Sequence, residues 1–597
     1  MDAMKFDTKG TASRPALEDV DEGDVEAFRA IDRMREAFLA QATGGLSPAA
    51  LSLAFYDWSL HLAMAPGKRL ELANKAARKA ARLLTYMGSS MLSQDVPPCI
   101  EPLPGDHRFS GKLWASPPYS LWAQAFLLNQ QWWHGVTHKV PGVEPHHQDV
   151  VSFTMRQILD VFAPSNNPFT NPEVIAKTIE TSGQNLVQGF RNWMEDANRH
   201  LTGQPEVGTE NFRPGREVAV TPGKVVYRNH LIELIQYSPA TAEVVAEPIL
   251  IVPAWIMKYY ILDLSPDNSF VRYLVGEGHT VFCISWRNPG AADHDLSLDD
   301  YRRMGVMDAL DAIGAIVPGR KIHATGYCLG GTLLSIAAAS MARAGDERLA
   351  SVTLLAAQTD FSEPGELALF IDPSQMHFLE SMMWNRGYLS SDQMAGAFQL
   401  LRSNDLVWSR LVHDYMMGER TPMIDLMAWN ADSTRMPYKM HAEYLQRLYL
   451  DNDLAAGRLV IDGRPVALQN IKAPMFAVGT ERDHVAPWHS VYKIHYLTDT
   501  DVTFVLTSGG HNAGIVSEPG HKHRHFRMAF KAFSDPCVSA DEWEAAAPVY
   551  EGSWWPQWSA WIKSHSDAER VGPPMLGAAN KGYPPLEDAP GTYVFQR

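Results

Sequence analysis

One cysteine of this chain lies in a glycine-rich run that is typical of a nucleophile on a tight turn. The run is Gly326-Tyr327-Cys328-Leu329-Gly330-Gly331. Residues 321–327 before it (KIHATGY) predict a short buried strand, and residues 332–344 after it (TLLSIAAASMARA) predict a helix of small side chains. The glycines relieve crowding where the backbone bends, and the helix N-terminus favours a thiolate. The pattern predicts an elbow with Cys328 as the attacking group, against the alternative of an inert core cysteine.

Such a nucleophile needs a histidine base and a carboxylate that orients the base. In folds with this elbow they follow in the order nucleophile, acid, histidine. Asp483 comes just after residues 473–480, an apolar run that predicts a buried strand. His511 comes after a second such run, residues 502–507, in a glycine-containing loop. A single Asp or His at a strand end is more often a cap or a satisfied polar group, but three such residues at three strand ends predict a catalytic set.

A cysteine in this position suits chemistry on thioesters. A free thiol is only a few per cent thiolate at neutral pH, and an adjacent histidine and helix N-terminus raise that fraction. Transfer of an acyl group from one thiol to another keeps the group activated, so an alcohol can still accept it. A serine ester would already have lost that driving force. The residues therefore predict acyl transfer from a thioester to a hydroxyl group.

Longer strings outside the elbow are more specific than the elbow itself. They are KYYILDL at 258–264, GHTVF at 278–282, SWRNP at 285–289, SNDLVW at 403–408, WN at 429–430 and GSWWP at 552–556, with PSN at 164–166, TNP at 170–172 and RNWMED at 191–196. Together with the elbow, these strings make nearly the whole chain resemble the class I polyhydroxyalkanoate synthases. Those enzymes polymerise (R)-3-hydroxyacyl-CoA into a storage polyester.

The resemblance implies an α/β-hydrolase catalytic domain with a helical lid insertion, preceded by a mostly helical N-terminal domain. It implies that Cys328 carries the acyl chain, that His511 is the base, and that Asp483 orients His511 or assists the attacking hydroxyl. The reaction would need no metal and no organic cofactor. The family works as a homodimer at the surface of polyester granules in the cytoplasm. A single chain that carries all parts favours the single-subunit class and short acyl groups.

The loop after a predicted strand at 249–252 is expected to supply one amide of an oxyanion hole, and Leu329 is expected to supply the other. Ala254 and Trp255 lie in that loop. The family usually has an asparagine where this chain has Met257. Because backbone donors survive side-chain changes, this departure bears on the shape of the acyl pocket and on rate more than on the reaction. Trp255 and Met257 are equally compatible with two apolar residues that pack beneath a loop.

A helical insertion is expected at about residues 361–470, before the strand of the acid, where insertions act as mobile lids. Trp384, Trp408 and Trp429 lie in it and indicate a hydrophobic substrate path, although tryptophan more often packs in a core. We take Trp429 as a substrate-binding candidate, together with His484, the residue after the acid.

The rest of the chain divides by composition. Residues 1–25 are polar and acid-rich and predict a flexible segment. Residues 26–205 predict a helical N-terminal domain, and residues 206–597 predict the catalytic domain. Helical spacing of apolar residues occurs at 25–42, 51–87, 119–133, 149–162 and 172–199.

Composition also narrows the class of protein. The chain has 597 residues, of which 46% are apolar, enough for a substantial core. Its net charge of −16 argues against nucleic acid as the main partner. CoA still requires local positive charge, for which residues 521–525 (HKHRH) and Arg287-Asn288 are candidates, although charge runs are usually solvated faces. The alternating histidines of 521–525 lack partners at ligand spacing, so no metal site is predicted.

The cysteines and the absence of targeting patterns indicate a compartment. Four cysteines with neither disulfide density nor C-x-x-C spacing suit a reducing environment. Cys283 lies in an apolar run and is predicted to be a core residue. With no signal-peptide pattern and no apolar run of membrane length, we expect the cell interior and no transmembrane segment.

Two other functions fit parts of the sequence. A hydrolase or thioesterase could use the same three residues and pass the acyl group to water, and the two reactions differ in whether polymer or free hydroxy acid accompanies the release of CoA. A non-catalytic protein that coats granules is supported only by the amphipathic N-terminal helices. The intact set of Cys328, Asp483 and His511 argues against it.

Overall fold

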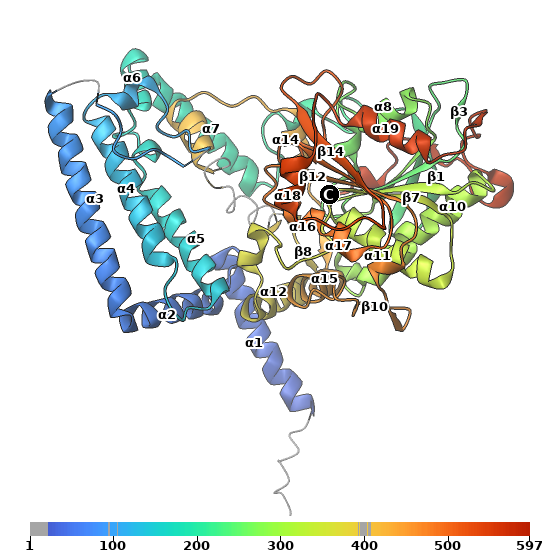
Figure 1. Ribbon diagram of the computed structural model, residues 1–597, viewed down its shortest axis with the longest axis horizontal. Helices are drawn as coiled ribbons and strands as arrows, with labels where there is room; N and C mark the ends of the chain where they lie inside the picture. Colours follow the sequence, from blue (N-terminus) through green and yellow to red (C-terminus); the bar gives the residue numbers. More distant parts are fainter. Residues whose placement is uncertain (1–21, 93–95, 104, 392, 395–402, 404–406) are drawn as a thin grey trace, which may run out of the picture.

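The computed structural model describes residues 22–92, 96–103, 105–391, 393–394, 403 and 407–597 (Figure 1). Residues 1–21, most of the segment expected to be flexible, lie outside the described residues, and Glu22 already begins a helix. Part of the SNDLVW string, residues 404–406, also lies outside them.

The N-terminal part is helical. Its helices are α1 (Glu22–Thr43), α2 (Pro48–Met64), α3 (Pro66–Leu92), α4 (Tyr119–Thr137), α5 (Pro145–Val161), α6 (Pro172–Glu180) and α7 (Gln184–Leu201). Short 3-10 turns lie at Lys112–Ala115, Pro164–Asn166 and Thr209–Asn211.

Two of the predicted helical stretches are each divided into two helices. Residues 51–87 fall in α2 and α3, which are separated at Ala65, because Pro66 has no N–H to donate and cannot continue a helix. Residues 172–199 are interrupted before α7, where Gly183 adopts a left-handed conformation with φ of 83°. Proline and glycine therefore set the helix boundaries that apolar spacing alone does not reveal.

Eleven strands of the described chain form one sheet, in the order β15-β14-β13-β12-β7-β6-β4-β5-β2-β1-β17. Their bounds are β1 (Gly223–Arg228), β2 (Ile232–Tyr237), β4 (Ile249–Val252), β5 (Val281–Trp286), β6 (Ile322–Tyr327), β7 (Leu349–Leu355), β12 (Met475–Thr480), β13 (Val502–Thr507), β14 (His525–Lys531), β15 (Val549–Glu551) and β17 (Glu587–Asp588). The six strands from β13 to β5 run parallel, and those outside them pair antiparallel.

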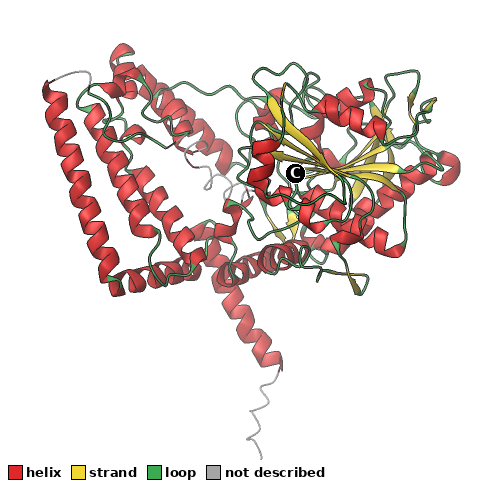
Figure 2. Cartoon of the chain, viewed as in Figure 1, coloured by secondary structure: helices red, strands yellow, loops and turns green. Residues whose placement is uncertain are grey.

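Helices cover both faces of this sheet (Figure 2). They include α8 (Phe270–Gly276), α10 (Asp308–Ile316), α11 (Leu329–Ala344), α16 (Trp488–Tyr492), α17 (Ile494–Leu497), α18 (Ala540–Ala546) and α19 (Trp555–Ser564), with the short α9 (Leu298–Asp300) leading into a π-helical turn at Tyr301–Met307. Every residue of β4, β5, β6, β12 and β13 is buried, as expected for parallel strands between two helical layers. Cys283 of β5 is fully buried, which confirms the prediction of a core residue.

The segment between β7 and β12 contains α12 (Pro373–Arg386), α14 (Asp425–Asn430) and α15 (Tyr438–Tyr444), with π-helical turns at Leu411–Met416 and Leu445–Leu450. It also contains strands that the sequence did not predict, namely β8 (Tyr388–Leu389), β9 (Met436–Pro437), β10 (Val460–Ile461) and β11 (Arg464–Pro465). Elsewhere β3 (Val244–Val245) pairs with β16 (Arg570–Val571), and 3-10 turns lie at Tyr259–Asp263, Ala291–Asp293, Glu366–Phe370, Leu468–Asn470, Ala579–Lys581 and Tyr593–Phe595.

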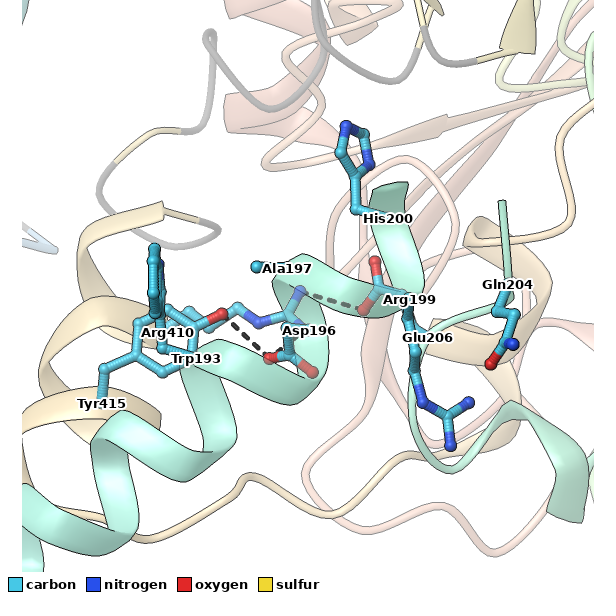
Figure 3. A pocket seen from close by; sticks show the side chains of 9 residues that line it. All are labelled: Trp193, Asp196, Ala197, Arg199, His200, Gln204, Glu206, Arg410 and Tyr415. Carbon is cyan, nitrogen blue, oxygen red and sulfur yellow. Dashed lines mark hydrogen bonds and ion pairs between the residues drawn. The ribbon is translucent and has the colours of Figure 1, made fainter. Parts of the chain in front are cut away.

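The N-terminal helices contact this segment at several places, and hydrogen bonds mark two of them. Near α12, the amide of Gln375 donates to the carbonyl of Gly45 (2.7 Å) and accepts from the N–H of Ser47 (2.8 Å). Along α7, the carboxylate of Asp196 accepts hydrogen bonds from Arg410 (3.3 Å) and Tyr415 (2.9 Å), beside a cavity of about 360 Å³ (Figure 3). The helical half is thus tied to the insertion by polar contacts.

Among the helices that the structure describes, we find none with the combined length and apolar character required to cross a bilayer.

Candidate active site

Cys328 lies between β6 and α11, as the sequence predicts, and its backbone is strained. Its φ of 51° and ψ of −124° are unusual for a residue with a side chain. A Cβ added at Gly326 would lie 2.3 Å from the Cα of Gly331, and one added at Gly330 would lie 2.1 Å from the carbonyl oxygen of Val252. The glycines are needed because backbone segments meet closely around the cysteine.

The parallel register brings the other two predicted residues to the same edge of the sheet. Thr480 at the end of β12 lies opposite Thr507 at the end of β13, so Asp483 and His511 follow from adjacent strand ends. The Nδ1 atom of His511 lies 2.8 Å from Oδ2 of Asp483. The Asp483 side chain is fully buried and that of His511 is 10% exposed. One carboxylate oxygen thus holds the imidazole, which directs its other nitrogen away from the acid.

The remaining bonds of Asp483 fix its carboxylate. Its Oδ1 accepts from the backbone N–H groups of Val485 (2.9 Å) and Ala486 (2.8 Å), and its Oδ2 also accepts from the hydroxyl of Thr480 (3.0 Å). Burial alone would raise the pKa of Asp483, but the charge of His511 and these hydrogen bonds hold it below its usual value. The carboxylate is therefore ionised and pre-oriented at neutral pH.

The pKa of His511 is shifted in the opposite direction. Burial alone would lower its pKa, but the charges of Asp483 and of the Cys328 side chain, and its hydrogen bonds to both, raise the pKa of His511 well above its usual value. The imidazole between an acid and a thiol can accept the thiol proton and hold it as imidazolium. That is the behaviour required of a base that activates a cysteine.

Two residues next to the predicted ones support this arrangement. The hydroxyl of Tyr327 donates to the side-chain oxygen of Asn512 at 2.6 Å, and the Tyr327 ring centroid lies 5.7 Å from that of His511. Sequence reasoning did not single out either residue. Both are immediate neighbours of predicted catalytic residues, and that adjacency is the only sequence signal that could have found them.

The expected oxyanion loop lies directly against the elbow. Gly330 is close to the carbonyls of Val252 and Pro253, and Leu329 is the first residue of α11, where N–H groups have no intrahelical partner. Ala254 and Trp255 are buried. The loop after β4 and the start of α11 can therefore place backbone donors on the two sides of an acyl carbonyl.

Residues 429–434 of the insertion, which we call the strap, hold that loop through backbone and side-chain hydrogen bonds. The N–H of Thr434 donates to the carbonyl of Ile256 (3.0 Å), and its hydroxyl donates to the carbonyl of Trp255. Met257 pairs with Ser433 in an antiparallel bridge. The backbone at Met257 is thus held whatever its side chain is, and the side chain packs half-buried against the same apolar cluster as Cys328.

Trp429 belongs to the strap. It is 3% exposed, and its indole N–H donates to the carbonyl of Lys258 at 2.7 Å. Its N–H is therefore committed to the protein. The three tryptophans of the insertion do not form one path, because Trp384 is 42% exposed and its ring lies 5.2 Å from the guanidinium of Arg33. Trp408 is half-buried at the edge of the described residues.

An aromatic wall lies beside the elbow, with side chains from the loop after β4, from the end of β5, from the π-helical turn after α9 and from the insertion. It consists of Trp255, Trp286, Tyr301, Phe361, Tyr444 and Tyr449. The hydroxyls of Tyr444 and Tyr449 lie 3.3 Å apart, and both tyrosines interact electrostatically with Cys328. The surroundings of the thiol are apolar, with a few buried hydroxyl groups.

The remaining candidates lie apart from this wall or are already engaged. His484 is half-buried, and its carbonyl accepts from the N–H of Glu366 at 3.2 Å. Arg287 lies 3.7 Å from the carboxylate of Asp293, and Asn288 bonds Gln596. In the run at 521–525, Arg524 turns inward to backbone carbonyls.

Comparison with known proteins decides the family. Residues 26–68 match the family described as Poly-beta-hydroxybutyrate polymerase N terminal, residues 105–274 match Poly-beta-hydroxybutyrate polymerase (PhaC) N-terminus, and residues 247–517 match the alpha/beta hydrolase fold. The Poly(3-hydroxyalkanoate) polymerase of Methylorubrum extorquens is 39% identical over 89% of this chain and 87% of that protein. The chain belongs to the poly(3-hydroxyalkanoate) polymerase family.

A second polymerase, the Poly(3-hydroxyalkanoate) polymerase subunit PhaC of Cupriavidus necator, is 37% identical over 82% of this chain and 83% of its own length. Among solved structures, a monoacylglycerol lipase of Paleococcus ferrophilus aligns over 56% of this chain and 99% of its own, at 15% identity and a TM-score of 0.31. The predicted family and the predicted α/β-hydrolase fold of this polymerase family member are confirmed.

Proposed function

We propose that this protein polymerises (R)-3-hydroxyacyl-CoA into polyhydroxyalkanoate and releases CoA, through an acyl thioester on Cys328. The names of its relatives, which are poly(3-hydroxyalkanoate) polymerases, support the overall reaction. The observation that carries the assignment of residues is the 2.8 Å bond between His511 and Asp483, formed at strand ends beside the strained elbow of Cys328.

In the first step, His511 takes the thiol proton as the Cys328 sulfur attacks the thioester carbonyl of the substrate. The carbonyl oxygen becomes an oxyanion, which backbone N–H groups of Leu329 and of the Ala254–Trp255 loop would stabilise. The intermediate then collapses and its bond to the CoA sulfur breaks. His511 returns the proton to the departing sulfur, so that CoA leaves as a thiol.

In the second step, His511 takes the proton of a 3-hydroxyl group as its oxygen attacks an enzyme-bound thioester. An ester bond forms, a carbon–sulfur bond breaks, and the sulfur receives the proton from His511. The chain grows by one unit. Asp483 orients His511 and stabilises its imidazolium form, or assists the hydroxyl directly, and the two roles differ in which step an Asp483 variant slows.

Trp429 and His484 remain proposals as substrate-side residues. Since the indole N–H of Trp429 is bonded to Lys258, only its ring can contact an acyl chain. The buried surroundings of Cys328, including Trp255 and Tyr444, suit an apolar acyl group.

We further propose a division of labour in which residues 26–205 serve location and partnering, residues 206–597 catalyse, and residues 361–470 act as a lid. The working place is the cytoplasmic surface of polyester granules, and the working form is a homodimer. Support comes from helix faces that expose large apolar side chains at spacings of three and four. On α1 they are Phe28, Ile31, Met34 and Phe38, on α2 Leu53, Tyr56, Leu60 and Met64, and on α7 Leu186, Val187, Phe190, Trp193 and Met194.

The test of the reaction is incubation of the full chain with (R)-3-hydroxybutyryl-CoA, with free thiol and insoluble product measured together. Polymer formed in proportion to released CoA is the expected result. Release of CoA with free 3-hydroxy acid instead would identify a thioesterase, and absence of any CoA release would leave only the granule-coating alternative. Mass spectrometry of the protein should place an acyl adduct on Cys328, and an adduct at Cys283 or Cys537 would overturn the mechanism.

A further inference from the structure

The loop that carries His511 is held from outside along its backbone. It consists of residues 508–517 and follows β13. The N–H of Arg482, in the loop that carries the acid, donates to the carbonyl of Gly509 at 2.9 Å. At the far end of the loop, two indole N–H groups donate to carbonyls, Trp554 to Gly514 (3.1 Å) and Trp555 to Ile515 (3.0 Å).

Arg524 supplies two further hydrogen bonds, one on each side of the histidine. Its Nη1 donates to the carbonyl of Ser508 at 3.1 Å, and its Nη2 donates to the carbonyl of Ala513 at 2.7 Å. The two acceptors lie three residues before and two residues after His511. A guanidinium has donors in a rigid planar fork, so both carbonyls are fixed relative to one another by a single group.

The guanidinium occupies a packed position. A Cβ added at Gly509, whose φ is 117°, would lie 2.7 Å from Nη1 of Arg524. The Nε–H of Arg524 is buried and has no hydrogen-bond partner among the described atoms. Burial lowers the pKa of Arg524, partly offset by the charge of Glu518. The two hydrogen bonds to the loop therefore offset part of the desolvation free energy of the guanidinium.

We propose that Arg524 is a positioning residue for His511: its two bonds close the loop around the histidine and set the distance from the imidazole to Asp483 and to Cys328. The proposal rests on the proposed role of His511 as the base. It also assigns Arg524, the arginine in the basic run at 521–525, to the loop backbone and not to the phosphates of CoA.

The expected effect follows from how steeply proton transfer depends on geometry. A misplacement of about 1 Å by a change outside the chemistry can reduce a rate by roughly 100-fold. Arg524→Met removes both bonds and keeps an unbranched apolar stem. We expect kcat to fall by about 10- to 100-fold, with KM for (R)-3-hydroxybutyryl-CoA changed less than about twofold. Arg524→Lys reaches one carbonyl at most, so its kcat should lie between those of Arg524→Met and the wild type.

Arg527→Met is the matched control. Arg527 lies three residues further on, in β14, and its Nη1 donates to the carbonyl of Ala547 at 2.9 Å. The Arg527→Met variant thus loses an arginine–carbonyl hydrogen bond of the same kind, but outside the His511 loop. We expect its kcat to stay within about twofold of the wild type.

The pH profile separates positioning from general loss of structure. Among the residues that the structure describes, the titratable groups that face His511 are Asp483, Cys328 and Tyr327. Because Asp483 helps to raise the pKa of His511, a loosened loop should move the limb of the kcat/KM profile that reports His511 to lower pH in Arg524→Met. A smaller fraction of active enzyme would lower the whole profile without moving this limb.

His511→Gln, assayed in parallel, makes the two levels of the argument distinguishable. If His511→Gln keeps turnover, the proposed base is wrong. If His511→Gln is inactive while folded Arg524→Met keeps kcat within about twofold, only the positioning role is wrong. A raised KM with unchanged kcat in Arg524→Met would also overturn it, in favour of contact with CoA phosphates. If Arg524→Met does not fold, the same criteria apply to Arg524→Lys.

Discussion

The two halves of the molecule treat apolar side chains in opposite ways. In the sheet, every residue of β4, β5, β6, β12 and β13 is buried, and the loops that carry Asp483 and His511 follow two of these strands. Among the N-terminal helices, Phe38 is 72% exposed and Phe190 is 58% exposed. Contiguous apolar faces of this kind mark surfaces that meet a partner. The sheet half buries its central strands, whereas several N-terminal helices leave apolar faces exposed.

The first prediction, with the largest expected effect, tests whether catalysis depends on the sulfur atom of Cys328 in the sheet half. In Cys328→Ala, loss of the nucleophile should reduce polymer synthesis by roughly 10⁴-fold or more, because no other thiol lies at the elbow. The fold should be unaffected, since alanine is smaller and the elbow glycines remain. CoA release and thermal unfolding measured on the same sample check both statements, with Cys537→Ser as the control for an exposed thiol. Residual acylation of the alanine variant would contradict the assignment.

The second prediction distinguishes the role of His511 from that of Asp483. His511→Gln should abolish both acylation and elongation, by roughly 10³-fold or more, because each step needs a base. Asp483→Asn should still accumulate acylated Cys328 while turning over slowly, if the acid acts mainly on the hydroxyl's attack. Intact-protein mass spectrometry after rapid quenching separates the two. Unchanged turnover in Asp483→Asn would remove Asp483 from the mechanism.

The third prediction tests the other half. In cells that make polymer, a tagged fragment of residues 1–205 should co-sediment with granules and should not be released by raised salt, because apolar attachment is not screened. In the full chain, Phe190→Glu together with Met194→Glu should lower the granule-bound fraction several-fold. Arg191→Glu, on the same helix, changes charge without removing apolar surface and serves as the control. A fragment that stays soluble, or that moderate salt removes, would refute this division.

The fourth prediction concerns the contact between the strap and the loop after β4. Thr434→Val keeps the shape of the side chain but removes its bond to the carbonyl of Trp255. We expect the rate of acylation of Cys328 to fall about tenfold, the scale of one lost bond of about 1.4 kcal/mol. Thr434→Ser, which keeps the hydroxyl, should stay near the wild type. Equal rates in the two variants would show that the strap does not set the loop.

The fifth prediction is the smallest and concerns stability. The pKa of Asp483 is lower in the folded state, so its stabilising contribution is present above its unfolded pKa of about 3.9 and is lost as pH falls through the folded value. The pKa of His511 is raised, so its contribution is present below about 6.5 and is lost as pH rises through the folded value. Asp483→Asn should therefore lower the unfolding temperature most between about pH 4 and 6.5. Thermal unfolding across pH checks this, and an offset that grows above pH 8 would contradict it.

The sequence was sufficient for the features that follow from chain order. The residue types and order of Cys328, Asp483 and His511 predicted three strand ends, and parallel strands bring such ends to one edge of the sheet. The strap and the Arg524 fork could not be predicted, because both depend on contacts between distant segments. Thr434 is an ordinary threonine in the sequence, and its role exists only because the insertion folds back on the loop after β4.

The strap has a consequence for exchanging parts between related enzymes. Residues 429–434 form hydrogen bonds with the loop after β4 although the two are far apart in the chain. Thr434, for example, follows Trp255 by 179 positions. Consider a chimaera in which the first part of the insertion comes from a relative. If the crossover back to this chain falls after residue 434, the strap comes from the relative while the loop after β4 stays native. A crossover before residue 429 keeps the native pair together. The boundary of a segment that can be exchanged is therefore set by these hydrogen bonds and not by the ends of the insertion.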